Sequence, residues 1–215
     1  MSLQMPITKR KIQRHFQYSL WKYALVVIGS ILVWNLLYTV TRYRSPEDLK
    51  VEFYAEGYAS QEVYSEMDSL IAQIHSQVMP EMEEVTYSIL TLDETYGEMQ
   101  LMVWISAAQG DVYLLSDERF QRLANGEAML DLTPYIDSGA LNVDGLRLRS
   151  FTLQTEEGTA GQTFGTWGIQ ADELTGLEAM GLFTRGGVLS VLAAGANEEY
   201  AIRFLNELLT RTRAD

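Results

Sequence analysis

The longest apolar run of the chain lies near its N-terminus and predicts a membrane-spanning helix. From Ala24 to Val40 the sequence reads ALVVIGSILVWNLLYTV, seventeen residues without a charge. Extending the segment to Leu20–Thr41 adds one charged residue, Lys22, whose aliphatic stem lets its ammonium group reach the headgroup region. About twenty residues at 1.5 Å rise cross a hydrocarbon core of roughly 30 Å. Aromatic residues near both ends are typical of interfacial belts: Trp21, Tyr23, Trp34, Tyr38 and Tyr43.

Basic residues beside this segment predict its orientation. Four basic residues and no acidic residue precede the segment, whereas the three that follow it, Arg42, Arg44 and Lys50, stand beside Glu47 and Asp48. The positive-inside rule then places residues 1–19 in the cytoplasm and residues 51–215 outside, with 42–50 as a linker. A cleaved signal peptide is the alternative, but the apolar run is longer than an h-region and its exit lacks a small-x-small site. We therefore expect an uncleaved signal anchor that binds the chain to the membrane.

The first half of the remaining chain alternates between strand and helix patterns. Apolar and polar residues alternate at 51–56, and apolar residues recur at helical spacing over roughly 61–79. The pattern repeats with a strand at 85–90 and a helix over roughly 95–108, for which we expect Met99, Met102, Val103 and Ile105 to face inward. A short apolar strand at 111–115 leads into a third helix, which Gly126 ends. This order predicts a parallel sheet with right-handed crossovers.

The second half of the chain does not continue this alternation of strand and helix patterns. Asp131–Gly145 is loop-like, and two segments that follow predict a β-hairpin, Gly145–Thr155 and Thr163–Ile169, across the turn Glu156–Gln162. A short helix is expected at Asp172–Gly181 and a buried strand at Gly186–Ala194. A closing helix begins after Asn197, with acidic residues in its first turn. We expect the 187–194 strand to join the same sheet as the earlier strands.

Composition and charge exclude several functions. The chain has no cysteine, so disulfides, thiolate metal sites and cysteine nucleophiles are absent. Because residues 1–44 carry +7 and the whole chain −13, residues 45–215 carry −20. A domain this acidic repels phosphate backbones, so we expect no nucleic-acid partner.

Several segments resemble the first lobe of extracellular solute-binding proteins. They are Gly110–Phe120 (GDVYLLSDERF), Leu130–Ile136 (LDLTPYI) and 187–209, which resembles the family's return strand and helix. The resemblance implies an α/β lobe with a mainly parallel sheet flanked by helices. In the family a second lobe lies between the last two segments, but here only about fifty residues separate Ile136 from Gly187. The chain therefore resembles one lobe without the other, and a single lobe offers a small solute fewer contacts for the same entropic cost of binding.

Candidate binding residues follow the predicted strands. In open parallel sheets ligands sit beyond the carboxyl ends of the strands. Those ends carry Glu56, Tyr58, Asp93, Ser116 and Asp117, and the Tyr58 ring suits stacking on a sugar or on a partner side chain. Turn and helix-capping roles are the alternative for these residues. Trp167, which lies between glycine-rich positions, is a further candidate for surface binding, with a place in the core as its alternative.

The sequence contains no motif that indicates catalysis or metal binding. The run Glu81, Glu83 and Glu84 does not have the ligand spacing of a calcium loop, and Asp93 and Glu94 are adjacent and point apart. The only histidines, His15 and His75, are expected on opposite sides of the membrane. We therefore expect no catalytic residues, no metal and no cofactor. The predicted function is a non-enzymatic, extracytoplasmic binding or interaction domain, whose partner is a membrane protein or a small solute. The alternative is a low-affinity receptor for a small solute such as a saccharide, working with a transporter or as a dimer.

Overall fold

The computed structural model describes residues 9–41, 46–58, 60–90, 96–150 and 165–213, with the backbone alone for 9–20 and 47. The chain divides into two units, Met1–Arg44 and Ser45–Asp215. Each is described by itself.

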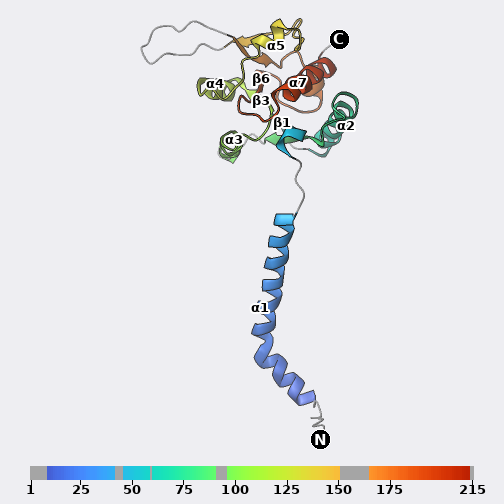
Figure 1. The fold of residues 1–215 in the computed structure, drawn as a ribbon, viewed down its shortest axis with the longest axis vertical. Coiled ribbons are helices and arrows are strands. Elements are labelled where there is room, and N and C mark those ends of the chain that lie inside the picture. The colour runs from blue at the N-terminus through green and yellow to red at the C-terminus, as the bar shows by residue number, and fades with distance from the viewer. Residues whose placement is uncertain (1–8, 42–45, 59, 91–95, 151–164, 214–215) are drawn as a thin grey trace, which may run out of the picture. The chain divides into compact units, whose positions relative to one another are not determined.

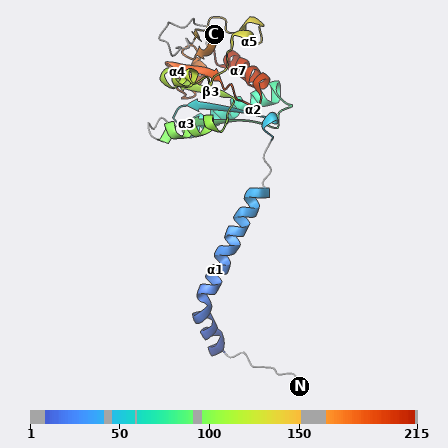
Figure 2. The same cartoon turned by 60° about the vertical axis from the view of Figure 1, so that its left-hand side comes forward.

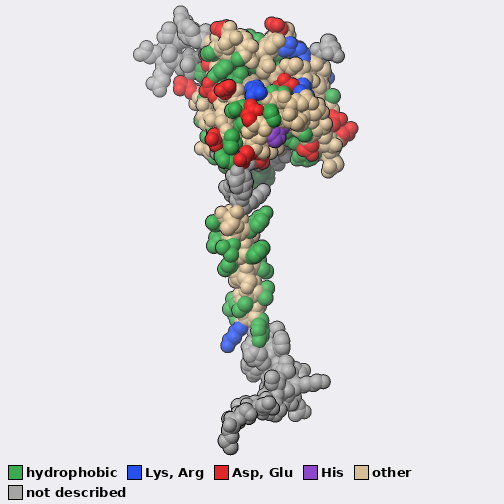
Figure 3. Space-filling model, turned by 45° about the vertical axis from the view of Figure 1, so that its right-hand side comes forward, with side chains coloured by type: hydrophobic (Ala, Val, Ile, Leu, Met, Phe, Trp, Pro, Cys, Tyr) green, Lys and Arg blue, Asp and Glu red, His purple; other side chains and the backbone are tan. Residues whose placement is uncertain are grey.

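The described residues of the first unit form one long helix, α1 (Lys9–Thr41), and apolar side chains surround its part at 21–41 (Figure 3). Its segment Trp21–Thr41 has a mean hydropathy of 1.9 and is the one helix of the described residues that is long and apolar enough to cross a membrane. The hydroxyls of Ser30, Thr39 and Thr41 each donate to the carbonyl four residues earlier, at 2.6–2.8 Å. These hydroxyls are thus satisfied within the helix.

The second unit opens with three parallel strands, as predicted. A 3-10 turn, η1 (Glu47–Leu49), leads into β1 (Lys50–Glu56), α2 (Gln61–Val78), β2 (Glu84–Leu90), α3 (Tyr96–Ser106) and β3 (Val112–Ser116). β1 pairs in parallel with β2 on one side and with β3 on the other. The α/β fold class is therefore confirmed.

The following elements complete the same sheet in antiparallel fashion. They are α4 (Asp117–Asn125), α5 (Thr133–Asp137), β4 (Leu148–Ser150), β5 (Thr166–Gln170), α6 (Thr175–Ala179), β6 (Gly187–Val191) and α7 (Glu198–Thr212). The strand order is β2-β1-β3-β6-β5-β4. The predicted hairpin is present as β4 and β5, and its turn lies outside the described residues. The predicted joining of the 187–194 strand to this sheet is confirmed by its pairing with β3.

Helices cover both faces of the sheet (Figures 1 and 2). On one face α2 and α7 pack over a core that includes Val51, Phe53 and Ala55 of β1, and the Phe53 and Phe204 rings lie 5.8 Å apart. On the other face α3 and α4 cover a second cluster, where Tyr54 contacts Trp104 at a ring distance of 4.2 Å. Alternate residues of β1 thus enter different clusters, as expected for a strand buried on both faces.

The predicted inward face of α3 is wrong for three of its four residues. Met99, Met102 and Val103 are 64%, 48% and 63% exposed, whereas Gly97 and Leu101 are buried. Ile105, the fourth, is partly buried against the second cluster. The helix is apolar on nearly all sides, so its periodicity could not distinguish the face that packs on the sheet from the face that meets solvent.

Candidate functional site

Glu56 ends β1 and is buried, with only 1% of its surface exposed. Its Oε1 accepts the backbone N–H of Ser116 at 3.1 Å, and its Oε2 lies 2.9 Å from Nη1 of Arg119. A buried carboxylate requires such compensation, because an unpaired charge in the interior is strongly unfavourable. Glu56 therefore links the ends of β1 and β3 to α4.

Arg119 also connects Glu56 to α3. Its Nε donates to Oε1 of Glu98, and Oε2 of Glu98 accepts from Nη1 of Arg122 at 2.8 Å. The hydrogen bond from Arg119 holds the pKa of Glu98 below its usual range. Burial disfavours the charged form of Arg119, but the bonds and charges of Glu98 and Glu56 outweigh this and raise its pKa. The result is a charge network shared by β1, α3 and α4.

Ser116 and Asp117 lie at the carboxyl end of β3, where the sequence predicted them. The Ser116 hydroxyl lies 3.5 Å from Oε1 of Glu56, although the residue occupies the N-cap position of α4. The Asp117 carboxylate accepts from Nη2 of Arg149 at 2.8 Å and from the Gln121 amide. The structure therefore brings Glu56, Ser116 and Asp117 to one end of the sheet, where each contacts other side chains of the chain.

Tyr58 lies two residues after Glu56, the last residue of β1, and is 65% exposed. Its ring lies 5.0 Å from the ring of Phe183 at an interplanar angle of 55°. The backbone N–H of Phe183 donates to the Glu56 carbonyl at 3.0 Å, so this contact is anchored to the end of β1. Tyr58 thus presents an aromatic face to solvent at the strand end.

The two remaining candidates do not add to this group. Trp167 lies on β5, which β6 separates from β3, and its ring is partly buried against the second core cluster. Asp93 lies outside the described residues. The strand-end site therefore consists of Glu56, Tyr58, Ser116 and Asp117.

Sequence reasoning missed the arginines of this site. Arg119 and Arg149 neutralise carboxylates that were themselves candidates. A signal for Arg119 exists, because residues 51–118 contain no Lys or Arg and Arg119 is the first cation after this stretch. A carboxylate at the end of a buried strand needs a cation nearby, and Arg119 is the first basic residue that follows Glu56 in the sequence.

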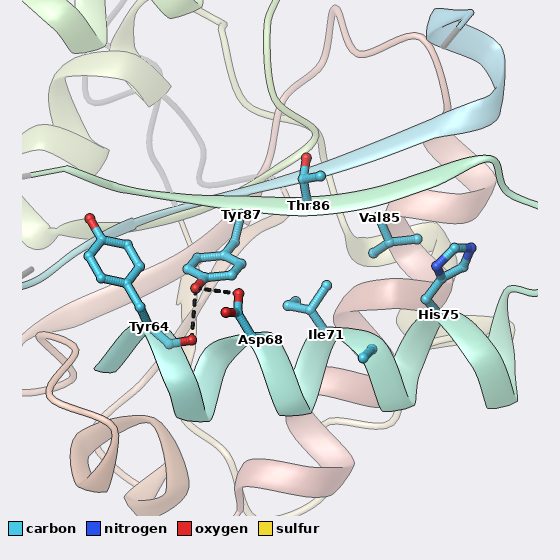
Figure 4. A pocket seen from close by; sticks show the side chains of 8 residues that line it. Tyr64, Asp68, Ile71, His75, Val85, Thr86 and Tyr87 are labelled. Atoms are coloured by element: carbon cyan, nitrogen blue, oxygen red, sulfur yellow. Dashed lines mark hydrogen bonds between the residues drawn. The ribbon is translucent and has the colours of Figure 1, made fainter. Parts of the chain in front are cut away.

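A separate hollow lies between α2 and β2, with a volume of about 490 Å³ (Figure 4). Tyr87 extends from β2 toward α2, where its hydroxyl lies 2.8 Å from Oδ1 of Asp68 and 3.0 Å from the Tyr64 carbonyl. Burial and the Asp68 carboxylate raise the pKa of Tyr87. At the other end, Nε2 of His75 lies 2.8 Å from the Met82 carbonyl.

Comparison with known proteins gives partial likeness only. No family model matches the chain, and no curated protein matches it significantly. An extracellular solute-binding protein family 1 structure from Alicyclobacillus acidocaldarius is 10% identical, with a TM-score of 0.41 over 60% of this chain and 29% of that one. A Listeria monocytogenes ABC substrate-binding protein in complex with cycloalternan is 16% identical, with a TM-score of 0.37 over 55% and 28%. Maltose-bound MalE3 of T. maritima is 18% identical, with a TM-score of 0.34 over 43% and 24%.

The chain thus spans less than a third of the length of these structures. The chain is similar, over part of its length, to extracellular solute-binding proteins.

Proposed function

We propose that the chain is a single-pass membrane protein whose residues 51–215 form a non-enzymatic interaction domain outside the cytoplasm. Residues 1–19 would lie in the cytoplasm, Leu20–Thr41 in the membrane, and 42–50 would be the linker. The apolar segment Trp21–Thr41 and the purely basic residues before it support this arrangement.

The observation that carries the interaction role is the engagement of the strand-end charges within the chain. Glu56 pairs with Arg119, and Asp117 pairs with Arg149. A small polar solute at this end would have to displace these contacts, and the released partners would lose hydrogen bonds. The face is therefore better suited to contact with a larger partner than to enclosing a small molecule.

A second feature that favours a protein partner is the outer face of α3. Tyr96, Met99 and Val103 follow one another at helical spacing and are all exposed. Together with Met102 they form a contiguous apolar stripe without a charged residue. Exposed apolar stripes of this kind are typical of contact surfaces.

A low-affinity saccharide receptor is the second candidate, and Tyr58 is the observation that favours it. Its exposed ring, braced by Phe183, is suited to stack on the apolar face of a sugar. The polar side chains of Glu56, Ser116 and Asp117 would then have to rearrange to reach the hydroxyls of the sugar.

Calorimetry of the full chain in a non-ionic polyoxyethylene detergent separates these candidates. Against a panel of sugars, amino acids and short peptides, the interaction role predicts no binding at the strand-end face tighter than about 0.1 mM, which is roughly 5 kcal/mol. Tyr58→Ala tests this face, and Tyr96→Ala, which removes another exposed tyrosine, is the matched control. Micromolar binding of a small solute that Tyr58→Ala abolishes and Tyr96→Ala leaves intact would reject the interaction role in favour of the receptor.

Topology is tested by fusing a reporter that is active only outside the cytoplasm. We expect activity from a fusion after Arg213 and none from a fusion before Lys9. Neutralising Lys9, Arg10, Lys11 and Arg14 together should lower the activity of the first fusion, because these charges orient the helix. Activity from a C-terminal fusion to a second reporter, one that is active only in the cytoplasm, would reject the proposed topology.

A further inference from the structure

β2 is an edge strand whose outer side is unpaired among the described residues. It pairs with β1 in a regular parallel register over seven residues, from Glu84 to Leu90. The Leu90 carbonyl accepts from Gly57 N–H at 3.2 Å, so Leu90 directs its backbone toward β1. Since backbone groups alternate along a parallel strand, the N–H and C=O of Val85, Tyr87 and Ile89 point away from the sheet.

Among the described residues this edge lacks the usual protection against further pairing. Exposed edges are normally blocked by lysine, proline, a bulge or a covering element. The β2 sequence, EVTYSIL, contains neither lysine nor proline, and its register with β1 has no irregularity. Its one charge, Glu84, stands at the start of the strand. Three outward residues therefore offer a row of donors and acceptors to an added strand.

The hollow beside β2 provides room for the side chains of such a strand. The hollow, of about 490 Å³, lies between β2 and α2 (Figure 4). Ile71 and Ala72 of α2 and Val85 of β2 give it apolar walls, and Asp68 adds an exposed carboxylate. Strand addition beside a helix uses this arrangement, in which main-chain bonds supply affinity and alternate side chains enter a groove.

Charge identifies the kind of segment that fits. Residues 51–118 contain fourteen Asp or Glu and no Lys or Arg. Asp68, whose Oδ1 lies 2.8 Å from the Tyr87 hydroxyl, is the acidic residue that lines the groove, whereas Glu62 and Glu66 are exposed elsewhere on α2. Figure 3 shows acidic side chains over the domain with some Lys and Arg side chains among them, and residues 45–215 carry −20 in all. A second copy would bring acid against acid, whereas a basic segment would be attracted.

We propose that β2 and α2 form a docking groove for an extended, positively charged polypeptide segment of a partner. The segment adds as a strand beside β2, bonding to the backbone of Val85, Tyr87 and Ile89, and its alternate side chains lie against α2 with a cation at Asp68. The inference specifies the partner chemistry of the interaction role proposed above. It requires neither the strand-end face nor a particular membrane topology, so its failure would leave those tests unaffected.

The binding experiment uses the full chain in detergent and a fluorescent heptapeptide that alternates lysine and valine. Fluorescence polarisation should show saturable binding. Ala72→Lys places a cation in the groove and should weaken binding at least tenfold, and Asp68→Asn should weaken it several-fold while keeping an acceptor for Tyr87. Ser65→Lys adds the same charge to an exposed position of α2 outside the groove and is the matched control.

Two further measurements distinguish strand addition from plain charge attraction. The same peptide with its lysines and valines N-methylated keeps its charge but loses its main-chain donors, so its binding should fall at least tenfold. In hydrogen exchange followed by NMR, the unmethylated peptide should newly protect the amides of Val85, Tyr87 and Ile89. The amides of Thr86 and Ser88 face β1 and should change little.

The proposal is overturned if the methylated peptide binds as well as the unmethylated one, or if Ser65→Lys weakens binding as much as Ala72→Lys. Absence of saturable binding would also overturn it. So would protection of the Val85, Tyr87 and Ile89 amides in a dimer of the chain without peptide, because a second copy would then occupy the edge.

Discussion

Nη1 of Arg119 lies 2.9 Å from Oε2 of Glu56, although the two residues are 63 positions apart in the chain. The Glu56 side chain is 1% exposed and that of Arg119 10%, so the pair is largely removed from water. In such pairs attraction offsets a large desolvation cost, and removing one partner leaves the other charge buried alone.

Removing Arg119 should therefore destabilise the domain strongly. For Arg119→Met we expect a loss of about 3–5 kcal/mol in the free energy of unfolding, measured by denaturant titration of the full chain. The double variant with Glu56→Gln should recover part of this loss, because the buried charge is also removed. Arg185→Met is the control: Arg185 is highly exposed and paired with Glu178, so it should change stability by at most about 1 kcal/mol. Equal effects of the two single variants would contradict the buried-pair interpretation.

Acid should weaken the fold through Glu98. The hydrogen bond from Arg119 lowers the pKa of this carboxyl in the folded state. Its stabilising contribution is therefore complete above the unfolded pKa of about 4.3 and is lost as the pH falls through the lower folded value. Urea midpoints measured from pH 7 to pH 2.5 should show a smaller acid-dependent decrease for Glu98→Gln than for the wild-type chain. Parallel curves for the two proteins would show that Glu98 contributes nothing to the acid response.

Gly110 should tolerate alanine much less than Gly145. Both have positive φ, +80° and +74°, but a Cβ on Gly110 would lie 2.3 Å from Cδ2 of Tyr54, whereas nothing lies within 4 Å at Gly145. Gly145→Ala thus measures the backbone cost, about 1–2 kcal/mol. Gly110→Ala should cost a further 1–3 kcal/mol for displacing the Tyr54 ring. Similar unfolding free energies for both variants would disprove the close contact.

The orientation of α3 gives a further test. Met99→Gln and Val103→Gln should each change the free energy of unfolding by about 0.5 kcal/mol or less, because both side chains face solvent. Leu101→Ala, at a side chain only 2% exposed, should cost about 2–5 kcal/mol. Thermal or chemical unfolding of the three variants decides between this orientation and the reverse, in which Met99 and Val103 would be the sensitive positions.

The local pattern of apolar and polar residues was sufficient to predict most of the helices and strands. The apolar faces of α2 and α7 and the alternation at β1 each follow from residues close in sequence, and the predicted bounds of β1 and α2 agree with the structure to within about one residue. The helix α5 at Thr133–Asp137 was expected to be loop. Its signals were present: Pro134 stands at its start, and the Asp131 carboxylate accepts the N–H of Thr133 at 2.9 Å.

The candidate site was less accessible to sequence reasoning. Position at a strand end correctly grouped Glu56, Ser116 and Asp117, because parallel strands end together. Their partners Arg119, Glu98 and Arg149 come from other elements, and no local periodicity encodes such pairings. The edge position of β2 likewise depends on strand order, which the sequence alone leaves open.

The place of β6 between β3 and β5 affects how the domain can be made. Of the six strands β6 is the last in the chain, yet it occupies an interior position in the sheet. During vectorial synthesis β3 therefore has an open side until residues 187–191 emerge, and Phe53 lacks its contact with Phe204 of α7 for longer still. A nascent chain stopped before β6 exposes both β2 and β3 as unpaired edges beside apolar side chains, a state prone to aggregation. The domain therefore reaches its folded state late, after nearly all of its residues have left the ribosome.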